Sequence, residues 1–154
     1  MSGRLAPAEV ERVAVAFAAV PLFSRLSERQ RHALAEKATT HGYRAGRTVV
    51  RQGDTSMALY VVLSGAVSIE REDESGGRTP LAPRVGANGF FGEMGLIDDE
   101  PRSATVTALE DTECALLAKW DFQSNVRLDP DIAIALMPVL NARIRDLTAR
   151  LTRQ

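Results

Sequence analysis

Short apolar runs that alternate with glycine-bearing turns occupy the central half of the sequence, residues 42–117. The run at 59–63 meets Ser64 and Gly65, and alternating residues resume at 67–70, which is typical of a β-hairpin. The other predicted strands lie at 48–50, 81–85, 104–108 and 113–117. Several short strands at this spacing indicate a barrel, a sandwich or a jelly-roll.

Helical patterns flank this strand region. Residues 8–19 and 27–38 favour helix, and Ser27 is a good N-cap for the second. After Lys119 an apolar stripe recurs at steps of three and four residues: Ile132, Leu136, Leu140, Ile144, Leu147 and Leu151. A chain of 154 residues fits one domain. We therefore predict N-terminal helices at 8–40, a β-region at 41–118 and C-terminal helices at 119–154.

Two features of the last predicted helix bear on its role. Pro138 lacks a backbone donor and pushes against the carbonyl of Ile134, which predicts a kink or break and offers a hinge. The apolar stripe could pack on the domain core, but it continues to Leu151, where little of the domain is left to cover. This favours a homodimer formed through the C-terminal helix.

Composition excludes several kinds of partner and site. Nineteen basic residues against twenty acidic ones, with a pI near 6.1, leave no basic surface for nucleic acid. The run at 13–23 is too short to span a membrane. Cys114 stands alone, which indicates a reducing cytoplasm. His32 and His41 form no cluster, so we expect no metal site and no metal-dependent β-barrel enzyme.

Residues 89–106 carry the clearest chemical pattern. Gly92 permits a sharp turn, and residues 93–97 can form a single helical turn after it. The first amides of such a turn have no internal partner, so those near Met94, Gly95 and Leu96 would bind an anion.

Two charged side chains complete this pattern. The guanidinium of Arg102 suits a phosphate. Glu93 would repel a phosphate and more readily accepts a hydrogen bond from a sugar hydroxyl. Phosphate and sugar side by side suggest a nucleotide. The competing interpretation is a local ion pair of Arg102 with Glu93, or with one of the acidic residues at 98–100.

The same stretch, GFFGEMGLIDDEPRSATV, resembles the phosphate-binding cassette of cyclic nucleotide-binding domains. Bacterial catabolite activator proteins and protein kinase A regulatory subunits contain such domains. The likeness extends upstream through Gln52-Gly53-Asp54 and residues 59–67, and covers roughly residues 20 to 150. It implies an eight-stranded β-roll with N-terminal helices and a C-terminal lid helix that closes over the base.

The resemblance also implies roles for individual residues. Glu93, beside Gly92, would hold the ribose 2′-hydroxyl, and Arg102 the cyclic phosphate. Ser103 would add a hydroxyl near the phosphate or base. Met94, Gly95 and Leu96 would line the phosphate cradle through backbone groups. No aromatic residue follows Phe122, so the expected base contacts come from the C-terminal helix: Leu140, Ile144 or Leu147 as apolar groups, and Asn141 or Arg145 as polar ones.

These implications lead to one expected function and two alternatives. We expect a cytoplasmic sensor of cAMP, less readily of cGMP, that is not an enzyme and needs no cofactor. The family's helix-turn-helix output domain has no counterpart in these residues, so the response would pass through an effector protein or a dimer. One alternative is a degenerate, ligand-free interaction module, against which the intact Glu93 and Arg102 argue. The other alternative is a metal-dependent enzyme on a similar β-barrel, against which the lack of a histidine cluster argues.

Overall fold

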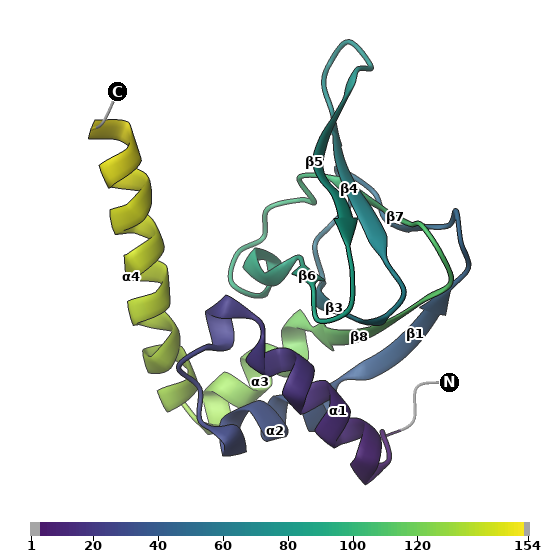
Figure 1. Cartoon of the computed structure of the whole chain (residues 1–154). Coiled ribbons are helices and arrows are strands. Elements are labelled where there is room, and N and C mark those ends of the chain that lie inside the picture. Colours follow the sequence, from purple (N-terminus) through teal and green to yellow (C-terminus); the bar gives the residue numbers. More distant parts are fainter. Residues whose placement is uncertain (1–3, 153–154) are drawn as a thin grey trace.

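Eight antiparallel strands in two four-stranded sheets form the centre of the computed structural model, which describes residues 4–152 (Figure 1). One sheet has the order β1-β8-β3-β6 and the other β2-β7-β4-β5. The strands are β1 (Thr39–Tyr43), β2 (Thr48–Val50), β3 (Ala58–Ser64), β4 (Val67–Glu72), β5 (Arg78–Val85), β6 (Phe90–Phe91), β7 (Thr105–Ala108) and β8 (Thr112–Ala118). The predicted eight-stranded β-roll is confirmed.

Helices flank the roll at both ends of the chain, and one short helix lies within it. The flanking helices are α1 (Pro7–Ala18), η1 (Pro21–Phe23), α2 (Glu28–Lys37), α3 (Lys119–Leu128) and α4 (Asp131–Thr152), and the helix between β6 and β7 is η2 (Glu93–Leu96), where η denotes a 3₁₀-helix. The predicted N-cap of α2 is confirmed, because the Ser27 hydroxyl accepts from the Gln30 amide at 3.1 Å and the Gln30 side chain accepts from the Ser27 amide at 2.9 Å.

Strand β3 separates two apolar cores. Its alternating residues face opposite sides, so Leu59 and Val61 contact the helices whereas Val62 faces the other sheet. Cys114 lies in the core between the sheets, and burial raises the pKa of its thiol to about 12. A thiol in this environment stays protonated.

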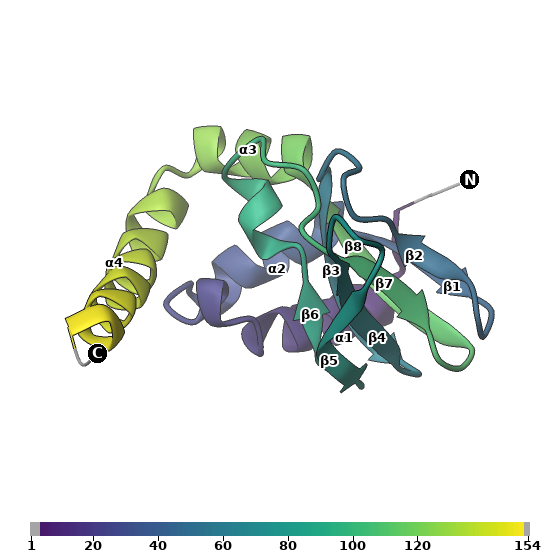
Figure 2. The same cartoon turned by 90° about the horizontal axis from the view of Figure 1, so that it is seen from above.

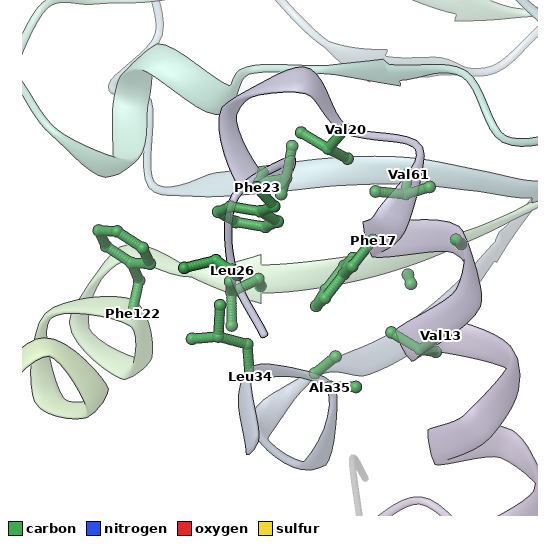
Figure 3. Close-up of a cluster of buried hydrophobic side chains, with 14 of the residues drawn as sticks. Val13, Phe17, Val20, Phe23, Leu26, Leu34, Ala35, Val61 and Phe122 are labelled. Atoms are coloured by element: carbon green, nitrogen blue, oxygen red, sulfur yellow. The ribbon is translucent and has the colours of Figure 1, made fainter. Parts of the chain in front are cut away.

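The larger core lies between the helices and the β3–β8 sheet (Figure 3). Phe23 is its centre: its ring meets Phe17 edge-on at 5.7 Å and stacks on Phe122 of α3 at 6.3 Å, between centroids. Val13 and Val20 are also fully buried here. The apolar run at 13–23 is therefore the part of the chain that holds the helices to the roll.

Helix α4 is continuous through Pro138, so the predicted break is wrong, whereas the alternative of a kink stays a prediction. Packing of Ile132 and Leu136 in the core anchors its first turns and offsets the hydrogen bond that the proline cannot donate. Beyond Leu140 no α4 residue that the structure describes is buried. No helix within residues 4–152 is long and apolar enough to cross a membrane.

Candidate ligand site

Residues of η2 line a cavity of about 520 Å³. Helix η2 lies on the side of the roll that faces α4 (Figures 1 and 2). Six of the predicted site residues line the cavity: Gly92, Glu93, Met94, Gly95, Arg102 and Ser103. The rest of the lining includes an apolar wall from strands of both sheets, made of Val50, Ile69, Leu81, Phe90, Phe91 and Val106. The structure thus joins a charged end and an apolar end in one cavity.

Gly92 sets the entry to η2. Its φ of +82° lies in the left-handed region, and the predicted helical turn follows at once as Glu93–Leu96. A Cβ at Gly92 would lie 2.0 Å from the Nη1 atom of Arg102 and 2.9 Å from the carbonyl oxygen of Ala58. Glycine is therefore required here both by the backbone conformation and by the approach of Arg102.

Arg102 is a buried cation, with only 8% of its surface exposed. Its Nη2 donates to the Ala58 carbonyl at 2.8 Å, and its Cζ lies 5.3 Å from the centroid of the Tyr60 ring. No carboxylate within residues 4–152 forms an ion pair with it, so the predicted alternative of a local pair is not observed. Burial lowers the pKa of Arg102, because the charged form loses hydration. An anionic ligand would supply the missing counter-charge.

The backbone holds Arg102 in place from the Gln52-Gly53-Asp54 segment. The Gly53 amide donates to the Arg102 carbonyl at 2.8 Å, and the Arg102 amide donates to the Asp54 carbonyl at 2.7 Å. The upstream motif therefore serves the site indirectly, since it fixes the residue that carries the charge.

Glu93 is mostly buried, with 17% of its side chain exposed, and lies 3.6 Å from the guanidinium of Arg143 on α4. The same Arg143 nitrogen donates to the Met94 sulfur at 3.4 Å. Arg143 therefore joins α4 to the cassette. This contact was not predicted, since the only arginine of the helix given a role was Arg145, which was expected to contact the base. Leu136, Leu140 and Arg143 follow the spacing of one helix face, and this spacing was the signal that could have identified it.

The remaining predicted contacts are outside the cavity lining. Leu96 is fully buried in the helical core, and Leu140 packs against that core. Asn141, Ile144 and Arg145 also do not line the cavity, and Ile144 is 62% exposed. Contacts of α4 with a base therefore stay predictions.

The cradle itself differs in detail from the expectation. The Gly95 amide donates to the Gly92 carbonyl at 3.1 Å, so this amide is not free. A Cβ at Gly95 would lie 2.0 Å from the hydroxyl oxygen of Ser56, a buried residue that also lines the cavity. Ser56 carried no signal in the sequence, because only the fold places it against η2.

Comparison with known proteins agrees with this geometry. Residues 40–127, more than half of the chain, match the model of the cyclic nucleotide-binding domain. The chain is 38% identical over 104 residues to the cyclic AMP receptor protein of Thermus thermophilus, covering 68% of this chain and 48% of that protein. It is 36% identical over 103 residues to a cAMP-dependent protein kinase regulatory subunit of Blastocladiella emersonii, covering 67% of this chain and 25% of that protein.

Solved structures show the same fold. The N-terminal domain of a transcriptional regulator from Streptomyces coelicolor superposes with a TM-score of 0.75 at 33% identity, covering 82% of this chain and 90% of that one. The Thermus thermophilus catabolite activator protein superposes with a TM-score of 0.70 at 35% identity, covering 86% of this chain and 62% of that one. Fold, cassette and matched residues together show that the chain belongs to the cyclic nucleotide-binding domain family.

Proposed function

We propose that this chain is a cytoplasmic sensor module that binds cAMP, and less readily cGMP, in the cavity beside η2. It is not an enzyme and needs no resident cofactor. The observation that carries the proposal is Arg102, a buried guanidinium that faces the cavity without a carboxylate partner in residues 4–152. The proteins named above as relatives are a cyclic AMP receptor and a cAMP-dependent kinase regulatory subunit, which supports this ligand class.

Each end of the cavity suits one part of a cyclic nucleotide. Arg102 would bind the cyclic phosphate through charged hydrogen bonds. Glu93 would accept a hydrogen bond from the ribose 2′-hydroxyl, and Arg143 holds its carboxylate in position. The apolar wall, which includes Ile69, Leu81 and Val106, would contact the base. Ser103 lies in the lining next to Arg102, where a hydroxyl can reach the phosphate or the base.

Thermal unfolding of ligand-stripped protein with cAMP, cGMP and 5′-AMP tests the proposal. Ligand at one hundred times its dissociation constant stabilises the folded state by about 2.7 kcal/mol. Each kcal/mol moves the Tm of a domain this size by about 2–4 °C. We expect a rise of several degrees with cAMP, less with cGMP at equal concentration, and none with 5′-AMP. No shift with either cyclic nucleotide at millimolar concentration would favour a ligand-free interaction module.

We further propose that the chain acts through an effector protein and as a homodimer joined by α4. Ile144, Leu147 and Leu151 are exposed. Together with Met137 and Leu140 they recur at the a and d spacing of a coiled coil. The described part of the chain offers no other element to cover this face, because α4 diverges from the roll along its distal half (Figure 1).

Sedimentation of the double variant Ile144→Glu/Leu147→Glu tests the dimer. We expect the wild type to sediment as a dimer and the variant as a monomer, because buried carboxylates at adjacent seam positions repel one another. Val15→Glu is the matched control, since Val15 is an equally exposed apolar residue on α1. A wild type that stays monomeric at high micromolar concentration would contradict the dimer.

A further inference from the structure

Lys119, the first residue of α3, contacts the wall of the ligand cavity. Its ammonium donates to the backbone carbonyl of Asp98 and to the carboxylate of Asp99, the latter at 2.5 Å. Only 12% of the Lys119 side chain is exposed, although Asp99 is almost fully exposed. The contact lowers the pKa of Asp99, through the hydrogen bond and the charge of Lys119. Lys119 is thus directed inward, toward the cassette rather than toward solvent.

The loop that Lys119 holds is part of the proposed binding site. Asp98 and Glu100 line the cavity, and the loop connects η2 to Arg102. Asp98 also accepts from the Glu100 amide at 3.1 Å, so the loop is a compact unit. Within residues 4–152, Lys119 is the one cation that pairs with this acidic segment. The cavity wall beside Arg102 is therefore joined directly to α3 through Lys119.

Helix α3 also contains a buried polar atom that has no hydrogen-bond partner within residues 4–152, the side-chain nitrogen of Asn125. A buried unsatisfied donor is costly, so a displacement of α3 that brought an acceptor to this nitrogen would be favourable. At the far end of α3, Asp129 accepts from Gln30 of α2 at 3.2 Å. Polar contacts therefore hold α3 at both ends, those of Lys119 at its start and the hydrogen bond of Gln30 with Asp129 at its end.

We propose that Lys119 is the positioning residue that joins the cavity wall to helix α3, so that ligand binding in the cavity changes the environment of the first turn of α3. The inference rests on the proposed function, because it needs a cyclic nucleotide in the cavity. Arg143 links Glu93 to α4, whereas Lys119 links the cavity wall to α3. The effect of the ligand reaches α3 through the Lys119 side chain, independently of the contact of Arg143 with Glu93.

The only tryptophan of the chain provides the readout. Trp120 follows Lys119 directly and is about half exposed. The experiment titrates cAMP and cGMP into wild type and variants, measuring affinity by calorimetry and the ligand-induced change in Trp120 fluorescence in parallel. The variants are Lys119→Met, Lys119→Arg and, as matched control, Lys37→Met, which alters the one other lysine, exposed at the end of α2.

We expect ligand to change Trp120 emission in the wild type and in Lys37→Met. In Lys119→Met most of this change should be lost and affinity should weaken by about tenfold. Lys119→Arg should restore both, because a guanidinium can replace the ammonium as donor. A purely structural role would lower the Tm of Lys119→Met without affecting the fluorescence response, and that result would overturn the inference.

Two wild-type results separate this inference from the proposed function. Calorimetric binding of either nucleotide without any Trp120 response would overturn the role of Lys119 and leave the binding function intact. Absence of calorimetric binding of both nucleotides would overturn the function and the inference with it.

Discussion

Replacing Arg102 with alanine should abolish the stabilisation of this domain by cyclic nucleotides while leaving the protein folded. Arg102 is the one buried guanidinium of the cavity, and no side chain in the described range neutralises it. Hydrogen bonds to charged groups contribute about 1.5–3 kcal/mol each. Two such bonds to a phosphate correspond to a loss of affinity of at least about a hundredfold. The measurement is the Tm with and without millimolar cAMP.

The unliganded Arg102→Ala protein should unfold close to the wild-type temperature, since two effects oppose each other. The Ala58 carbonyl loses its 2.8 Å hydrogen bond, which destabilises the variant. Removal of an unpaired buried charge stabilises it. Arg84→Ala is the matched control, because Arg84 is an exposed guanidinium of β5 outside the cavity lining. Undiminished stabilisation of Arg102→Ala by cAMP would show that the phosphate does not bind at this residue.

Local signals in the sequence predicted the elements that local interactions determine. The N-cap at Ser27 was predicted from residue types alone, because it forms within four residues, as does the capping box with Gln30 that the structure adds. The predicted hairpin pairing of 59–63 with 67–70 is wrong, because β3 pairs with β8 and β6 in one sheet whereas β4 pairs with β5 and β7 in the other. Only the turn between the two strands was predicted from the same kind of local signal. Its Gly65 has φ +89° and leaves no space for a side chain against Asp111 and Thr112. The cassette residues were also predictable, because Gly92 and the turn after it form one short segment.

The missed strands have no such local signal. β1 consists of Thr39–Tyr43, which is largely polar, and it is a strand because it pairs with β8 at the edge of its sheet. It begins inside the range predicted for the N-terminal helices. β6 has only two residues, Phe90–Phe91, and its pairing with β3 places Phe91 against Tyr60, with ring centroids 4.8 Å apart. Such strands depend on long-range pairing, which the resemblance could imply and a pattern of residues could not.

The contacts of α4 with the cassette were the least predictable part of the site. Whether Arg143 or Arg145 reaches Glu93 depends on the rotation of α4 about its axis, which Ile132 and Leu136 set by packing in the core. The continuation of α4 through Pro138 has the same origin. The contact of Arg143 and the continuity of α4 at Pro138 both depend on tertiary packing. Helix propensities and the rule that proline interrupts a helix describe only the isolated helix, so they could not predict either feature.

Replacing Gly92 with alanine should have the largest effect on the unliganded fold among substitutions at the site. The positive φ alone costs about 1 kcal/mol with a side chain present. The new Cβ would also overlap Arg102 and approach the Ala58 carbonyl. Overpacking of this kind costs about 1–3 kcal/mol more. At about 2–4 °C for each kcal/mol, the Tm should fall by roughly 5–15 °C.

The control that isolates the contact is Gly46→Ala. Gly46 has φ +86°, nearly the same as Gly92, but a Cβ there meets nothing within 4 Å. Both variants therefore carry the conformational cost, and only Gly92→Ala carries the overlap with Arg102. The difference between their Tm shifts measures how tightly the buried cation is held against η2. Equal shifts with unchanged cAMP affinity would contradict this prediction, because they would show that the added Cβ does not displace Arg102. A larger shift with weakened cAMP binding is the expected result, because Arg102 can leave the overlap only by leaving the position from which it binds the phosphate.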